Sequence, residues 1–232
     1  MNLSCLQKGE GRDIVFLHGY LASKECFAPQ IAYFSRRFRV TALDFPGFGQ
    51  AGALPAAWSV ADYADWLTEA LAALGIIRPC VVAHSFGGRV AVKCLSRGNL
   101  FDRAVLAGCA GIRPRRTFSY YVRVKTYRIV RTFAPRYAQR HFGSEEYRTL
   151  PPVMRESYKK IVNEDLREDA RRIARPVLFV NGTRDTAVPP ASVRVYLSCV
   201  KGSSVFWMED CGHFAFLDNP LAFNAATEEF FS

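Results

Sequence analysis

The sequence predicts an α/β fold, in which a mostly parallel central sheet is flanked by helices and one helical segment is inserted. Two observations support this prediction. Short runs of branched and aromatic residues alternate with longer stretches of helical periodicity, and polar residues follow several of the apolar runs. Strands that alternate with helices form parallel sheets covered on both faces. At 232 residues, half of them hydrophobic, the chain can bury the core that such a sheet needs.

Six runs have the composition of buried strands, being rich in apolar residues and bounded by polar or turn-forming ones. The predicted strands are Ile14–His18, Arg39–Leu43, Cys80–His84, Ala104–Ala107, Val177–Asn181 and Ser204–Met208. In open parallel sheets ligands bind at the carboxyl ends of the strands. Four polar residues lie at or just beyond such ends, namely His18, Asp44, Ser85 and Asp185.

Between the second and third strands, the segment 59–74 has the spacing of an amphipathic helix. Its apolar residues recur at Val60, Tyr63, Ala64, Leu67, Leu71 and Leu74. Gly75 would end this helix, because glycine readily adopts the left-handed conformation that follows a helix end.

Ser85 lies in the run AHSFGG at 83–88, directly after a predicted strand. A serine between small residues at this point indicates a nucleophile elbow, a strand-to-helix turn so sharp that the hydroxyl is exposed. Side chains at 83 and 87 would collide across that turn, so both positions need small residues. Ala83 stands where the usual motif has glycine, and it adds only a methyl group.

Two further residues complete the arrangement that an activated serine requires. Asp185 follows the fifth predicted strand after a loop that contains glycine, and His213 follows the sixth. Serine, then aspartate, then histidine is the chain order of one known catalytic triad architecture. By itself Asp185, beside Arg184, would be interpreted as a surface turn residue. Its place between Ser85 and His213 favours a catalytic interpretation.

With these motifs the chain resembles the α/β-hydrolase superfamily, in particular its compact, cap-bearing branch. That branch includes carboxylesterases, carbon–carbon bond hydrolases acting on ring-cleavage products, and pimeloyl-acyl-carrier-protein methyl ester esterases. The resemblance extends from about Asp13 to the C-terminus. It also rests on the motifs LHGY at 17–20, DFPGFG at 44–49 and GHF at 212–214.

The resemblance implies a role for each candidate residue. Ser85 would attack a carbonyl carbon, His213 would accept its proton, and Asp185 would orient the imidazole. The backbone N–H groups of Tyr20 and Phe86 would form the oxyanion hole. We expect His18, His84 and Asp44 to be structural, and we expect neither a cofactor nor a metal.

A basic block interrupts the alternation of strands and helices. Between Arg113 and Lys160 the sequence holds 13 Lys or Arg against 3 Glu, an excess of 10 that equals the net charge of the whole chain. The resembled family inserts its helical cap at this point. We therefore expect a cap at 111–173 and a hydrolase core at 1–110 and 174–232. Within the cap, Phe118, Val122, Ile129 and Phe133 fall near one helical face.

The basic cap has two interpretations. It is either a solvated helical surface or a surface that attracts an acidic partner, such as an acyl carrier protein, an anionic acyl substrate or an anionic membrane. Nucleic acid fits less well, because the block contains no recognisable binding module. Nothing in the sequence indicates an oligomeric state.

Cysteine usage and the N-terminus predict a cytoplasmic protein. Seven cysteines, an odd number without a Cys-x-x-Cys pair, argue against a disulfide scaffold or a structural zinc site. The sequence has no apolar run of about 18 residues that could span a membrane. The first residues also lack the pattern of a signal peptide.

The leading hypothesis is a serine hydrolase that needs no cofactor and cleaves an ester or thioester of a small to medium acyl group. Three alternatives stay open: a carbon–carbon bond hydrolase of a dienoic keto acid, a ligand- or carrier-binding protein that turns over slowly, and a hydroxynitrile lyase, a rare use of the fold that would retain the triad. A dehalogenase is excluded, because it would need a carboxylate where the chain has Ser85.

Overall fold

A computed structural model describes residues 3–113 and 150–232 of the chain. The strands in these residues are β1 (Cys5–Lys8), β2 (Arg12–Leu17), β3 (Phe38–Leu43), β4 (Cys80–His84), β5 (Ala104–Ala107), β6 (Val177–Gly182) and β7 (Ser204–Met208). They form one sheet in the order β1-β3-β2-β4-β5-β6-β7. β1 pairs antiparallel with β3, and every other neighbouring pair is parallel.

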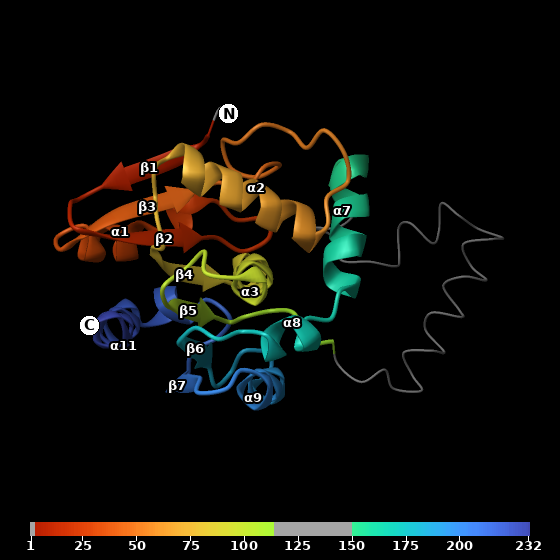
Figure 1. The fold of residues 1–232 in the computed structure, drawn as a ribbon. Helices are drawn as coiled ribbons and strands as arrows, with labels where there is room; N and C mark the ends of the chain where they lie inside the picture. Colours follow the sequence, from red (N-terminus) through yellow and green to blue (C-terminus); the bar gives the residue numbers. More distant parts are fainter. Residues whose placement is uncertain (1–2, 114–149) are drawn as a thin grey trace, which may run out of the picture.

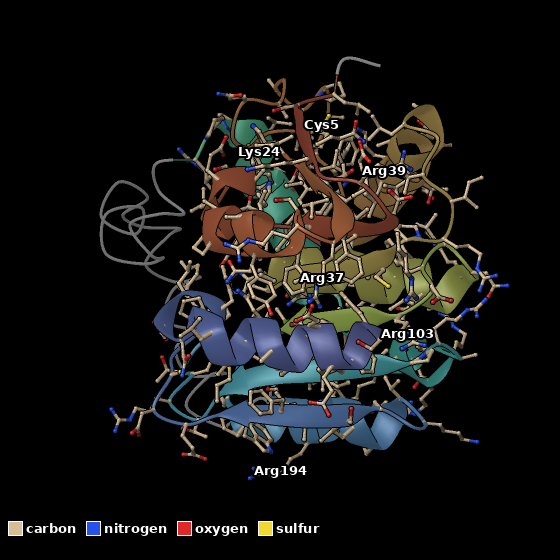
Figure 2. The ribbon with its side chains drawn as sticks, turned by 90° about the vertical axis from the view of Figure 1, so that its left-hand side faces the viewer. Cys5, Lys24, Arg37, Arg39, Arg103 and Arg194 are labelled. Carbon is tan, nitrogen blue, oxygen red and sulfur yellow. The ribbon has the colours of Figure 1, made fainter. Side chains whose placement is uncertain are left out.

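Helices cover both faces of this sheet. The described helices are η1 (Lys24–Phe27), α1 (Ala28–Phe34), α2 (Val60–Ala73), α3 (Phe86–Arg97), α7 (Pro152–Asn163), α8 (Arg167–Arg171), α9 (Pro190–Cys199), α10 (Ala215–Asp218) and α11 (Pro220–Phe231). Figure 1 shows α1 and α11 on one face of the sheet and α2, α3 and α9 on the other. Figure 2 is turned so that α1 and α11 face the viewer.

The strands supply both halves of the core. Along β2, Val15 and Leu17 pack into the cluster that contains α2 and α3, whereas Ile14 and Phe16 pack into the cluster that contains α1 and α11. Successive side chains of a strand point to opposite faces, so a sheet covered on both sides needs apolar residues throughout. This explains why the strands read as continuous apolar runs.

The predicted fold class is confirmed, and all six predicted strands are present with ends shifted by at most two residues. The prediction missed β1, whose residues Leu6, Gln7 and Lys8 are exposed. An edge strand pairs on one side only and is only partly covered, so its sequence carries no apolar pattern.

The predicted helix 59–74 is confirmed as α2. The Ser59 hydroxyl accepts a hydrogen bond from the Asp62 N–H at 3.3 Å, and the Asp62 carboxylate accepts one from the Ser59 N–H at 2.6 Å. This reciprocal cap satisfies two backbone donors at the start of the helix. Gly75 follows the helix with φ +65°, as its position predicts.

Among the described residues, two helices lie in the range predicted as the cap. α7 begins at Pro152, a favourable place for proline, because proline at a helix start loses no hydrogen bond. α8 is preceded by Leu166, and the Asp165 carboxylate accepts a hydrogen bond from the Arg167 N–H at 3.1 Å. The cap limits 111 and 173 stay predictions. The apolar face at 118–133 lies outside the described residues.

Candidate active site

Ser85 forms the turn between β4 and α3. Its backbone has φ +50° and ψ −103°, a conformation that costs a residue with a side chain about 1–3 kcal/mol. The elbow is held by the Ser85 N–H, which donates to the Ala107 carbonyl at 3.0 Å, and by the Gly87 N–H, which donates to the His18 carbonyl at 3.1 Å. From 80 to 92, Ser85 is the only residue that is not buried. The strained turn therefore leaves Ser85 partly exposed within a buried stretch of chain.

Close packing explains the small residue that follows the elbow. A Cβ atom at Gly87 would lie 2.4 Å from the Leu17 carbonyl oxygen, which no side chain can accommodate without backbone movement. The requirement for glycine at this position is therefore a consequence of how closely α3 approaches the end of β2.

Asp185 and His213 form a hydrogen-bonded pair beyond the ends of β6 and β7. The His213 Nδ1–H donates to the Asp185 Oδ2 at 2.8 Å. The other carboxylate oxygen accepts from the N–H groups of Ala187 and Val188, each at 2.8 Å. Asp185 is buried. With Nδ1 committed as a donor, the His213 Nε2 is left as the acceptor nitrogen.

The end of β5 brings Ser85 next to this pair. Ala107 accepts the Ser85 N–H, and the following residue, Gly108, lies against the imidazole: a Cβ atom there would be 3.1 Å from the His213 ring. Among the described residues, the structure records no hydrogen bond from the Ser85 hydroxyl to His213 or Asp185. In unliganded sites such bonds are often long and shorten when substrate binds.

The loop after β2 packs against the elbow. A Cβ atom on Gly19 would lie 3.5 Å from the Ser85 Cβ. The rings of Tyr20 and Phe86 meet edge to face, with centroids 5.6 Å apart. Within 3–113 and 150–232, the structure records no acceptor for the N–H of Tyr20 or of Phe86. Two residues with uncommitted backbone donors thus flank the serine.

The two histidines that we expect to be structural have backbone partners. The His18 Nδ1–H donates to the Gly19 carbonyl at 2.7 Å, and Nε2 accepts from the Phe45 N–H at 3.1 Å. The His84 Nε2–H donates to the His213 carbonyl at 3.1 Å. Burial lowers the pKa of His18, and burial together with nearby His213 lowers the pKa of His84 to about 3. Both rings are therefore neutral at pH 7.

Asp44 anchors the loops around the site through a partner that the sequence did not reveal. The Lys24 N–H and Nζ donate to its carboxylate at 2.8 and 2.6 Å, and the Gln50 N–H and Ser4 hydroxyl donate at 3.0 and 2.7 Å. Burial alone would raise the pKa of Asp44, but these hydrogen bonds outweigh it and lower the pKa to about 2. Lys24, labelled in Figure 2, is itself buried.

The described residues contain no cluster of three or more His, Cys, Asp or Glu side chains that could hold a metal ion. No helix among them is long and apolar enough to cross a membrane. Cys109, which lies against the elbow at Gly88, is a free thiol whose pKa burial raises to about 12. At neutral pH it therefore stays a protonated, unreactive thiol.

A model of the alpha/beta hydrolase family matches residues 14–226, almost the whole chain. The chain belongs to the alpha/beta hydrolase family. Pimeloyl-[acyl-carrier protein] methyl ester esterase of Aeromonas hydrophila is 22% identical to it and aligns over 99% of both chains. An esterase from Exiguobacterium antarcticum has the same fold, with a TM-score of 0.79 at 20% identity, covering 99% of this chain and 96% of that one.

A third relative matches only in part. The (E)-2-((N-methylformamido)methylene)succinate hydrolase of Acinetobacter baylyi is 36% identical over 104 residues. The match spans 44% of this alpha/beta hydrolase and 40% of the Acinetobacter enzyme. Family and relatives together support a hydrolase.

Proposed function

We propose that this protein is a serine hydrolase that cleaves an ester or thioester of a small to medium acyl group. Ser85 is the nucleophile, His213 the general base and acid, and Asp185 the residue that orients His213. The observation that carries this proposal is the 2.8 Å bond between Asp185 and His213 beside a serine held at φ +50°.

The proposed reaction proceeds through an acyl-enzyme. The Ser85 oxygen attacks the substrate carbonyl carbon while the His213 Nε2 accepts its proton. The N–H groups of Tyr20 and Phe86 stabilise the resulting oxyanion, and each such donor contributes about 3 kcal/mol to transition-state binding. His213 then protonates the leaving group, and a water molecule, activated in the same way, releases the acid. These steps require no cofactor.

We further propose that the acyl group is anionic or carried by an acidic carrier protein. The name of the Aeromonas relative and the basic block at 113–160 both support this. Several described members of the block contact other parts of the chain: Arg113 donates to Asn163 and Lys160 to Ala57. The electrostatic argument therefore rests mainly on basic residues at 115–148, outside the described part of the chain.

The carbon–carbon bond hydrolase would need a basic side chain that binds the substrate carboxylate. Arg89, the buried arginine closest in sequence to Ser85, donates instead to the carbonyls of Ile161 and Glu164 at 2.8 and 3.1 Å. Its position thus lends no support to that alternative. A binding protein would differ from both enzymes by stoichiometric binding with scarcely any turnover.

The test is hydrolysis of p-nitrophenyl esters across a series of acyl lengths by the wild type and Ser85→Ala. We expect turnover to fall at least about 1,000-fold in Ser85→Ala, because triad members act as a unit. Ser198→Ala is the matched control, since its hydroxyl donates to a carbonyl within α9. Equal activity of Ser85→Ala and Ser198→Ala would overturn the proposal.

A further inference from the structure

Helix α7 contacts the loop that bears one of the proposed oxyanion donors. The Tyr20 hydroxyl donates to the Met154 carbonyl in the first turn of α7 at 3.1 Å. One turn later, the Tyr158 ring lies 5.1 Å from the Tyr20 ring. Burial raises the pKa of the Tyr20 phenol above its usual value, so the hydroxyl stays protonated and can donate. The side chain of Tyr20 therefore fastens its own loop to α7.

The same ring also reaches the second proposed donor. Tyr20 packs edge to face on Phe48, with centroids 4.8 Å apart, and on Phe86 at 5.6 Å. Phe86 is in turn held by Tyr63 at 4.9 Å and Phe45 at 5.1 Å. The Tyr20 side chain thus lies between α7 and the residue that carries the other N–H.

Among the described residues, the loop near Tyr20 is held by a backbone hydrogen bond from the Ala22 N–H to the Gly19 carbonyl at 3.3 Å and by contacts at its two ends. On one side, His18 is fixed by its hydrogen bonds to Gly19 and Phe45. On the other side, Lys24 is fixed by Asp44. Between these points Leu21 is 47% exposed and has φ +58°, a conformation that residues with side chains seldom adopt. The phenol therefore fastens to α7 the residue whose N–H would face the oxyanion.

The other end of α7 is attached to the elbow helix. The buried guanidinium of Arg89, one helical turn after Ser85, donates to the Ile161 and Glu164 carbonyls at the C-terminal end of α7. A cation at this end of a helix satisfies unpaired carbonyls and complements the helix dipole. Figure 1 shows α7 beside α2 and α3, in agreement with these contacts.

We propose that Tyr20 is a positioning residue through which the docked helix α7 sets the geometry of the oxyanion hole. This inference rests on the proposed function. Its physical basis is that an oxyanion donor stabilises the transition state only when it is fixed before the reaction. α7 thereby belongs to the catalytic apparatus without contacting the reacting atoms.

The test compares Tyr20→Phe with Tyr33→Phe on a p-nitrophenyl ester. Tyr20→Phe removes only the hydroxyl that binds α7, and Tyr33→Phe removes one that donates to Glu228 at 2.6 Å. A hydrogen bond of this kind corresponds to roughly a threefold to tenfold effect. We expect kcat to fall by about that factor in Tyr20→Phe, with KM within about twofold, and to be unchanged in Tyr33→Phe.

Inhibitor binding separates positioning from a general structural effect. A trifluoromethyl ketone forms a tetrahedral adduct with Ser85 whose oxyanion occupies the hole, whereas the planar product acid forms no such adduct. Tyr20→Phe should therefore weaken binding of the ketone more than binding of the acid, by about the same factor as kcat. Tyr158→Leu removes the other contact with α7 and should give the same pattern. In the double variant, the fall in kcat should be smaller than the two single effects combined, because the two side chains share one attachment to α7.

The inference is overturned if kcat and the ratio of ketone to acid affinity in Tyr20→Phe and Tyr158→Leu match those of Tyr33→Phe. If Ser85→Ala abolishes turnover in the same series, that result leaves the proposed function standing. If Ser85→Ala retains full turnover, the proposed function fails and the inference fails with it.

Discussion

At the scale of the residue, Gly108 is the clearest case of a backbone position that the site requires. It has φ +50°, and a Cβ atom there would lie 3.1 Å from the His213 ring and 3.3 Å from the Asp185 Oδ2. We expect Gly108→Ala to displace the imidazole and lower kcat at least about tenfold, since small misplacements of catalytic groups are costly.

Gly202→Ala is the control for this prediction. Gly202 has φ +72°, and a Cβ atom there would meet nothing within 4 Å, so alanine introduces backbone strain alone. Both variants should lose about 1–2 kcal/mol of unfolding free energy, measured by urea denaturation. Equal kcat values for the two variants would show that the contact with His213 is unimportant.

The buried position of His84 makes the free energy of unfolding depend on pH. Its pKa is lowered from 6.5 to about 3 in the folded chain, so between these values the unfolded chain binds a proton that the folded chain does not. The contribution of neutral His84 to the free energy of unfolding is therefore fully present above about pH 6.5 and is lost progressively as the pH falls toward 3.

We expect the urea midpoint of the wild type to drop more between pH 7 and pH 5 than that of His84→Gln. Glutamine keeps a donor for the His213 carbonyl but cannot be protonated. His18 also has a lowered pKa, so part of the pH dependence should persist in the variant. Parallel changes in the two proteins would contradict the prediction.

At the scale of the element, the loops after β2 and β3 are joined by the buried pair of Lys24 and Asp44. Removing one partner of a buried ion pair leaves an uncompensated charge and typically costs about 3–5 kcal/mol. We expect a loss of that size in Lys24→Met, measured by urea denaturation.

Arg39→Met provides the comparison, because Arg39 pairs with Asp13 at 2.6 Å on the surface, where its side chain is 44% exposed. An exposed pair contributes little to the free energy of unfolding, because solvent screens its charges. Similar losses in the two variants would mean that the Lys24 pair does not stabilise the loops through burial.

How far the sequence predicts an element depends on whether its determinants are local. The apolar runs and the helical spacing of segment 59–74 are local, and they predicted six strands and α2. The candidate residues Ser85, Asp185 and His213 were found through their order and their places after strands. The attachment of Tyr20 to Met154 joins residues 134 positions apart, and no local pattern reveals such a partner. No local pattern reveals the partners of Lys24 and Arg89 either, because tertiary packing determines them.

At the scale of the whole molecule, the net charge of +10 is matched by the excess in the block at 113–160. If that block attracts an anionic or carrier-bound substrate, neutralising Arg123, Arg128 and Arg131 together should lower kcat/KM for such a substrate. Activity on a small neutral ester should be spared. The difference should shrink at high salt, because exposed charges are screened beyond about 8 Å at physiological ionic strength.

The matched variant removes the same number of positive charges elsewhere, at the exposed residues Lys8, Arg36 and Lys201. It should leave both substrates unaffected. Equal losses in the two triple variants would assign the effect to net charge, and equal losses on both substrates would remove the electrostatic argument.

The most direct test of the central claim is covalent labelling of the nucleophile. The chain is incubated with a fluorophosphonate, which reacts with activated serines, and the product is analysed by intact mass and peptide mapping. We predict one adduct per chain on Ser85, its absence in Ser85→Ala, and its slow formation in His213→Ala. A wild-type chain that gains no adduct, or gains it on a different residue, would contradict the assignment of Ser85 as the nucleophile.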